Sequence, residues 1–329
     1  MPITDPLNVH VNRPLTDLSV GEFQTEAARY PALAVAPLVP SRHLSDVYYE
    51  LDRGDLVRLE MGPRVSGAEA DAAGYDLTTT AFTLDRWALK KPTGFDEIAN
   101  QDEVLQLEET DMQYLIQQWL LRMSERAVAT LLTTGVWTGS TTGADLVAGD
   151  VGGAWTAAGG GVPVVAIHNQ RESIKQRSMQ NLDNRNFHLF CGSDVYQILR
   201  EHGDIESKFT GVQVGIMDEQ KIAQALNIGG VHVVDTIRNT AAEGAADVSA
   251  YLMDQDDAAL VYVAPRPGKK TFSAAYTFVG AHRAGLSPLG HMIKSWDDQV
   301  HDAHITELNA YFRHIVVAAT GGAYFNEIV

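Results

Sequence analysis

The longest periodic pattern of apolar and polar positions runs from Asn100 to Thr134. Apolar residues recur there every three or four positions, and neither Gly nor Pro interrupts them. This spacing places the apolar side chains on one face of a helix. Asn100 stands where it can cap the first turn, and Gly135 follows the last periodic residue. The pattern predicts one long amphipathic helix, roughly 50 Å in length at about 1.5 Å per residue, that serves as a spine.

Two stretches with strand-like alternation precede this helix, within residues 45–91. Residues 56–61 and 77–84 show a period of two, and a segment rich in Gly and Ala, 62–74, separates them. The pattern predicts a long two-stranded hairpin with a mobile tip. Neither face of the hairpin has enough apolar residues to be stable alone, so we expect it to contact another surface.

The first 40 residues hold six of the twelve prolines of the chain, with short apolar segments between them. Prolines at this density prevent a continuous helix. We therefore predict an extended arm, and a neighbouring subunit is one surface on which its apolar residues could lie. A loosely attached terminus is the alternative.

After the predicted spine helix, the pattern changes to short helices and strands. A loop rich in Gly and Thr leads to a helix that begins at Pro163. Residues 187–265 combine strands and helices, and one of these helices is expected to have Ser193 as its N-cap and Gly203 as its end. Apolar, strand-rich segments close the chain at 272–281 and 305–329. This order predicts an α+β fold with a compact mixed unit at 187–265.

The composition is that of a globular protein. The chain has 329 residues, of which 45% are hydrophobic and 20% charged, so it can bury a sizeable core. No apolar run reaches the ~18–20 residues that cross a bilayer, and no signal-peptide pattern begins the chain. The single cysteine, Cys191, excludes an intrachain disulfide and lies in an apolar run, which predicts that it is buried.

The formal net charge of −17 excludes a protein that holds nucleic acid mainly through its phosphates. That mode of binding needs clustered Lys and Arg, whose contacts release counterions. A surface of this sign would instead repel DNA that lies beside it.

No motif identifies a catalytic, cofactor or metal site. The sequence has no phosphate-binding glycine motif and no nucleophile elbow. His291, His301, His304 and His314 invite a metal hypothesis, but they form no known ligand pattern, and polar surface or capping roles explain them better. We predict no catalytic residue, no cofactor and no metal ion. A soluble α/β enzyme is the alternative from another class.

In the order of its parts and in several local segments, the chain resembles the major capsid proteins of tailed double-stranded-DNA bacteriophages, which have the Hong Kong 97-like shell fold. The similar segments are RYPALAVAPLVP from Arg29, LKKPTGFDEIANQDE from Leu89, TTGVW from Thr133, DDAALVYVAPRP from Asp256, AAYTFVG from Ala274 and RHIVVAATGGAYFNEIV from Arg313.

This resemblance implies a division into the four parts of that fold. They are an N-terminal arm at 1–40, an extended E-loop at 45–91, a peripheral (P) domain at 100–180 and 270–329 with the spine helix at 100–134, and an axial (A) domain at 187–265. The arm begins almost at Met1, so we expect no N-terminal scaffolding extension.

The resemblance also implies a structural protein without enzymatic activity. Such a protein assembles with itself, as pentamers and hexamers, into an icosahedral shell that encloses double-stranded DNA without sequence-specific binding. Scaffolding, portal and decoration proteins are the further partners implied, and the location is the virion, or the host cytoplasm during assembly. An encapsulin-type nanocompartment shell, which encloses protein cargo, has the same fold and is the nearer alternative.

Within this resemblance, charged residues of the hairpin and the spine helix are candidates for contacts between subunits. Isolated surface ion pairs contribute little, so their effect would come from repetition around a closed lattice. No residue matches the Lys–Asn cross-link that some members of the family form. The candidate cations are Arg58, Arg64 and Arg86 on the hairpin and Lys90 and Lys91 at its base, and the candidate acids of a neighbour are Glu103, Glu108 and Glu109.

Overall fold

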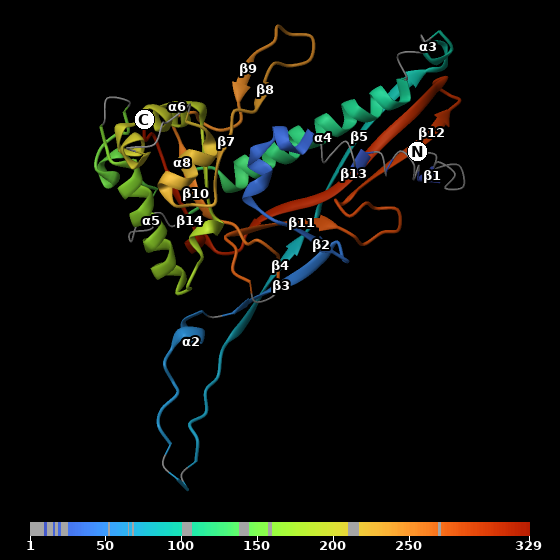
Figure 1. Cartoon of the computed structure of the whole chain (residues 1–329). Helices are drawn as coiled ribbons and strands as arrows, with labels where there is room; N and C mark the ends of the chain where they lie inside the picture. Colours follow the sequence, from blue (N-terminus) through green and yellow to red (C-terminus); the bar gives the residue numbers. More distant parts are fainter. Residues whose placement is uncertain are drawn as a thin grey trace.

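A computed structural model of the chain describes residues 10–11, 16, 19–20, 26–51, 53–64, 66–67, 69–100, 107–137, 145–156, 160–209, 217–268 and 271–329. Half of the predicted N-terminal arm lies outside the described residues, and so does Glu103. Figure 1 shows a body built around two sheets and one long helix, from which a hairpin projects far beyond the rest of the chain.

The long helix, α4, covers one face of the larger sheet. It extends over 25 residues, Leu107–Leu131, and buries one apolar face that includes Leu115, Ile116 and Leu120. These side chains pack against alternate residues of the sheet, such as Leu308. The predicted spine helix is therefore present, and the sheet supplies the surface that its apolar face requires.

The larger sheet has six strands in the order β1-β12-β13-β11-β2, with β5 beside β13. Strand β13 is the longest, and it pairs antiparallel with β12, β5 and β11. The bounds are β1 His10–Val11, β2 Leu38–Ser41, β5 Asp85–Gly94, β11 Ala275–Gly280, β12 His291–Asp298 and β13 Ala303–Val316.

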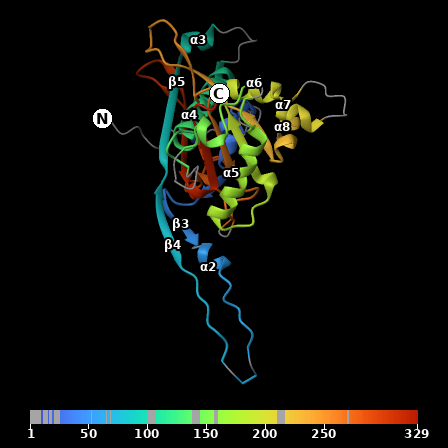
Figure 2. The same cartoon turned by 90° about the vertical axis from the view of Figure 1, so that its left-hand side faces the viewer.

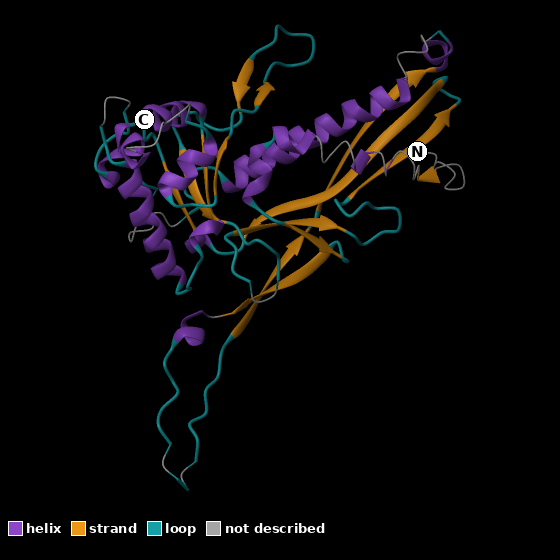
Figure 3. Ribbon diagram, in the orientation of Figure 1, coloured by secondary structure: helices purple, strands orange, loops and turns teal. Residues whose placement is uncertain are grey.

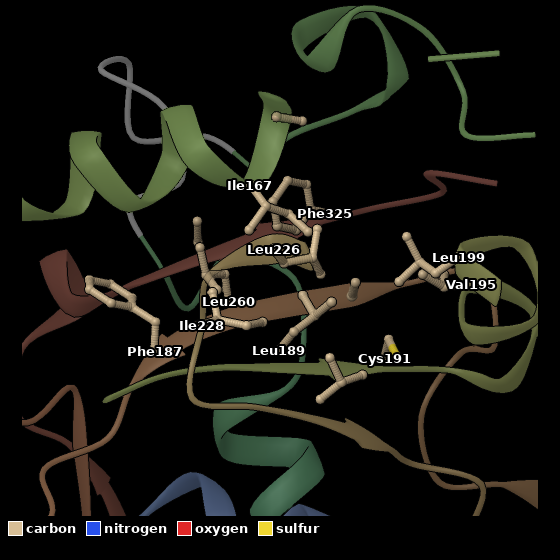
Figure 4. Packing of buried hydrophobic residues seen from close by; sticks show 14 of the residues in the cluster. Ile167, Phe187, Leu189, Cys191, Val195, Leu199, Leu226, Ile228, Leu260 and Phe325 are labelled. Atoms are coloured by element: carbon tan, nitrogen blue, oxygen red, sulfur yellow. The ribbon is translucent and has the colours of Figure 1, made fainter. Parts of the chain in front are cut away.

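The smaller sheet has four strands in the order β14-β10-β6-β7, with helices packed on one face. Figure 4 shows side chains of these strands and helices meeting in one apolar cluster. Cys191 is buried in it, as predicted, and burial raises the pKa of its thiol to about 12. The bounds are β6 Phe187–Cys191, β7 Gly230–Val233, β10 Ala258–Tyr262, β14 Gly322–Phe325, α5 Pro163–Ser178, α6 Ser193–Glu201, α7 Gly203–Glu206 and α8 Glu219–Leu226.

Two hairpins and several short helices complete the described chain (Figure 3). The long hairpin pairs β3 Ser45–Leu51 with β4 Leu77–Thr83, and the second pairs β8 Ile237–Asn239 with β9 Ser249–Tyr251. The short helices are α2 Arg53–Val57, α3 Phe95–Ala99 and the 3-10 turns Ala27–Arg29, Pro31–Val35, Ala148–Val151, Asn184–Asn186, Ser207–Phe209 and Ala319–Gly321. Of the helices that the structure describes, none has both the length and the apolar character needed to span a bilayer.

Several predicted boundaries are wrong. Asn100, expected to cap the spine helix, ends α3 and donates hydrogen bonds to the carbonyl of Asp96, and the segment between it and Leu107 lies outside the described residues. Residues 56–61 do not form a strand, since the β3–β4 ladder ends at the Leu51–Leu77 pair and α2 follows it. The alternation of apolar and polar residues in 56–61 therefore does not produce a strand, because the segment has no partner strand.

The ends of α6 also differ from the prediction. Gly192, not Ser193, is the N-cap, and the N–H of Ser193 donates to Gln255 Oε1 at 2.9 Å. A side chain distant in sequence thus satisfies this group, so no hydroxyl cap is needed. α6 ends at Glu201, and Gly203, the predicted end of this helix, is instead the first residue of α7.

Candidate assembly surfaces

The long hairpin exposes apolar side chains that no other described residue of its chain covers. Of the nineteen large apolar side chains exposed among the described residues, eight lie between residues 44 and 77. Leu59 and Met61 are fully exposed, and Tyr75 is 63% exposed. Exposed apolar residues gathered on one projecting element are typical of a surface that binds another protein.

The base of the hairpin is fixed to the body by aromatic side chains. The ring of Phe82 stacks on that of Phe278 with their centroids 4.1 Å apart, and Tyr48 lies 6.1 Å from Phe278. Beside these rings is a groove of about 640 Å³, which Asp46 and Glu50 line from the hairpin side. The anchored end and the exposed tip together make the hairpin an arm with one attachment point.

The candidate cations of the tip lie on the loop that follows α2. Arg58 pairs within its own chain, with Asp55 at 3.1 Å and Glu60 at 3.4 Å. Arg64 is exposed near the end of the loop. The charge of Arg58 is therefore largely balanced before any second copy approaches.

The three other candidate cations belong to the sheet and not to the hairpin, because they lie in β5. Arg86 donates to Asn309 Oδ1, at 2.8 Å from Nη2 and 3.2 Å from Nε, and its Cζ lies 5.9 Å from the centre of the Tyr311 ring. Lys90 is exposed opposite Glu307 in the ladder, and Lys91 Nζ donates to the carbonyl of Pro92 at 3.3 Å.

The candidate acids Glu108 and Glu109 lie in the first turn of α4, where they complement the positive end of the helix dipole. Glu108 is exposed, and Glu109 is partly exposed. Within the described part of the chain, neither forms an ion pair with a candidate cation. The structure thus separates the two sets of charges, and their pairing between copies stays a prediction.

Two cations near Arg86 were not among the sequence candidates. Lys294, on β12, is half-buried, and Arg283 is exposed on the loop before that strand. Burial lowers the pKa of Lys294, Glu307 raises it, and the nearby positive charges of Arg283 and Arg86 lower it further. Only the register of the strands places these residues together, so the order of residues in the sequence gave no signal for them.

The histidines of the metal hypothesis have separate partners. His301 Nδ1 lies 2.7 Å from Asp298 Oδ2, and His304 Nδ1 lies 2.7 Å from Asp297 Oδ1. Among the described residues, no group of three or more His, Cys, Asp or Glu side chains could hold a metal ion.

Comparison with solved structures gives full-length matches, although no protein-family model and no curated protein matches the chain. A phage-related protein from Bordetella bronchiseptica RB50 is similar with a TM-score of 0.70 at 11% identity, over 97% of this chain and 98% of that one. The mature capsid of bacteriophage PhiM1 matches with a TM-score of 0.53 at 11% identity, over 90% and 86%.

An encapsulin complex from Synechococcus elongatus PCC 7942 also matches, with a TM-score of 0.53 at 8% identity, over 90% of this chain and 86% of that one. Identities this low establish the fold alone, and the matched chains include both phage capsids and an encapsulin. The chain has the Hong Kong 97-like α+β fold of phage capsid proteins.

Proposed function

We propose that the chain is the major capsid protein of a tailed double-stranded-DNA bacteriophage. In this role it is a structural subunit without enzymatic activity, and it assembles with itself into an icosahedral shell. The observation that carries the proposal is the projecting hairpin, whose exposed apolar residues need a partner, in a chain whose fold is shared along nearly its full length with a phage-related protein.

The physical basis of the assembly is the repetition of weak contacts. A hairpin of two strands is marginally stable alone and gains stability when another surface covers it. If each copy offers one hairpin and one receiving surface, every subunit of a closed shell makes both contacts. Many such contacts stabilise the shell although each is weak.

The four-part division belongs to this proposal. The hairpin corresponds to the E-loop, α4 and the larger sheet to the peripheral domain, and the smaller sheet with its helices to the axial domain. Strand β14 pairs with β10 in the smaller sheet, so we extend the axial domain to include residues 322–325. The N-terminal arm at 1–40 remains an assignment from the resemblance.

The acidic composition supports a wall that encloses DNA without binding it tightly. A net charge of −17 leaves little net attraction for phosphates. The shell would therefore confine the packaged DNA without binding particular base sequences. We place the mature protein in the virion and the unassembled protein in the host cytoplasm. Scaffolding, portal and decoration proteins are the further partners that this role implies.

Electron microscopy and sedimentation of the purified chain, expressed alone, test the proposal. The expected result is closed shells, or rings of five and six subunits, that sediment far faster than the 35.8 kDa monomer. A monodisperse monomer or dimer at all protein and salt concentrations, even in lysates of cells that produce the other phage head proteins, would overturn it.

An encapsulin shell is the second candidate, because an encapsulin matches with the same TM-score as the PhiM1 capsid. The two functions differ in the contents of the particle. DNA inside particles isolated from the native source, detected by absorbance and nuclease protection, supports a capsid. A protein that co-purifies in fixed proportion inside the shell supports an encapsulin.

A further inference from the structure

The groove of about 640 Å³ lies where the base of the long hairpin meets the body of the chain. On the hairpin side it is lined mainly by β3, and on the body side by β2, β11 and the segment 267–273. The rest of the hairpin projects away from the body in both perpendicular views (Figures 1 and 2). A cavity of this volume can hold a small organic molecule.

The buried part of the groove lining is aromatic. Phe82 of β4 and both Tyr276 and Phe278 of β11 are less than 10% exposed. Tyr48 of β3 is partly buried, and the centre of its ring lies 6.1 Å from that of Phe278. The faces of aromatic rings attract cations, and the attraction is stronger where water is excluded. This lining therefore suits methylene groups and a positive charge beside them.

The hairpin side of the groove carries two carboxylates. Asp46, Tyr48 and Glu50 alternate along β3, so their side chains point to the same face of the strand, and all three line the groove. Asp46 Oδ1 accepts a hydrogen bond from the N–H of Val47 at 2.8 Å. Glu50 Oε1 accepts one from Thr80 Oγ1 at 3.0 Å. These bonds orient the carboxylates and leave further acceptor positions on each.

Among the described residues, no cation pairs with these carboxylates. The described residues that line the groove include no Lys, Arg or His. Neither Asp46 nor Glu50 forms an ion pair within the described part of the chain. Partly buried carboxylates beside apolar rings are incompletely hydrated, so a cation that enters the groove replaces hydration that they lack. The groove is thus complementary to a cation with an apolar body.

The spacing of the two carboxylates selects the shape of this cation. Asp46 and Glu50 are four residues apart on one strand, which corresponds to about 13 Å at about 3.3 Å per residue. One small ion cannot contact both. We propose that the groove binds a linear aliphatic polyamine, with a terminal ammonium group at each carboxylate and the methylene chain across the ring of Tyr48. This inference concerns a small-molecule ligand and does not depend on the proposed function.

A polyamine bound in this way contacts the hairpin and the body together. The carboxylates belong to β3, and the rings behind them belong largely to β11. A ligand that binds only the folded arrangement of the two stabilises that arrangement. Spermidine should therefore slow hydrogen exchange of the unmodified chain in β3, β4 and residues 271–278, and leave exchange in β8 and β9 unchanged.

Isothermal titration calorimetry of the full chain with spermidine at low salt tests the binding itself. The expected result is one saturable site per chain. Mg²⁺ carries positive charge without a methylene chain, so it should not displace spermidine at equal concentration. Putrescine is too short to reach both carboxylates and should bind at least about fivefold more weakly, as expected for the loss of one ion pair.

Substitutions test whether the two carboxylates act at opposite ends of the ligand. Asp46→Asn and Glu50→Gln should each weaken spermidine binding by about five- to tenfold, because each removes one charge-assisted contact. Each should also reduce the preference for spermidine over putrescine, since only the longer cation uses both carboxylates. The matched control is Glu243→Gln, which removes an exposed charge from the loop of the second hairpin and should leave binding unchanged.

Four results would overturn the inference. The first is the absence of spermidine binding at millimolar concentrations. The second is binding that both substitutions leave unchanged or that Mg²⁺ abolishes at equal concentration, because an acidic protein attracts any cation diffusely. The third is unchanged hydrogen exchange in β3 and in residues 271–278. The fourth is binding that appears only in Lys269→Gln with Lys270→Gln, two residues that lie outside the described chain, because the groove would then be filled by the chain itself.

Discussion

His232, His291 and His314 have pKa values of about 4, because burial disfavours their charged forms. His291 illustrates the environment. Its ring nitrogens lie 2.7 Å from Ser19 Oγ and 2.8 Å from Ser287 Oγ, and its ring lies 4.4 Å from that of Trp119. None of these contacts carries a negative charge that would stabilise an imidazolium ion.

These histidines predict loss of stability in acid. Below about pH 6.5 the unfolded chain binds protons that the folded chain does not accept until about pH 4, so the free energy of unfolding falls across this window. Urea unfolding between pH 8 and pH 4 measures the effect. His314→Gln should reduce the slope by up to about 1.4 kcal/mol per pH unit within the window. The exposed His301→Gln is the control, and an unchanged slope for His314→Gln would contradict the prediction.

Gly192 is required by a close approach of two backbone segments. A Cβ at this position would lie 2.3 Å from the backbone of Gln255, which cannot move aside without disturbing the smaller sheet. Gly192→Ala should lower the free energy of unfolding by at least about 2–3 kcal/mol. Gly203→Ala is the matched control, because its Cβ would have no neighbour within 4 Å. Equal melting temperatures for the two variants would show that the contact is not rigid.

At the scale of elements, the sequence predicts best those that carry their own periodicity. The apolar stripe of α4 repeats over 25 residues, and Pro163 marks the first turn of α5, so both helices were predictable. The start of the spine helix was not. Asn100 ends α3, and an Asn can stand at the end of one helix as well as before the start of another, so the residue type alone does not locate the first turn.

Pairing between distant strands was beyond prediction for a different reason. Arg86 and Lys90 follow the hairpin directly in sequence, which suggested that they belong to it. The structure places them in β5 because Asp85–Gly94 pairs with β13, more than 200 residues later. The choice of partner strand depends on the packing of the whole sheet, and local propensity carries little information about it.

The attachment of the hairpin rests on aromatic contacts, of which the stack of Phe82 on Phe278 is the tightest. Phe82 is buried against Phe278, and both belong to the cluster that joins the hairpin to the sheet. Phe82→Leu should lower the free energy of unfolding by about 1–2 kcal/mol and increase hydrogen exchange in β3 and β4. Leu77→Ala, at an exposed position of the same strand, is the control. Unchanged exchange in β3 and β4 would mean that other contacts fix the hairpin.

At the scale of the whole molecule, some parts of the chain pack against a buried core and others do not. The two sheets share their cores with helices, whereas the loop beyond the β3–β4 ladder is exposed almost throughout its described residues. The order of parts predicted this contrast, because a hairpin with so few apolar residues has no core of its own.

This contrast predicts that the hairpin loop can be removed without unfolding the chain. In the variant, residues 52–76 are replaced by Asn-Gly, a turn that suits a two-residue connection between paired strands. Because the loop contributes little to the buried core, the circular dichroism spectrum should keep its shape and the melting temperature should change by no more than about 3 °C. Closed shells, by contrast, should disappear in sedimentation and electron microscopy. The control variant shortens the exposed loop of the second hairpin, residues 241–246, to the same turn. Shells of normal size from the first variant would show that assembly does not depend on the long hairpin, and a lost fold would show that its loop stabilises the subunit itself.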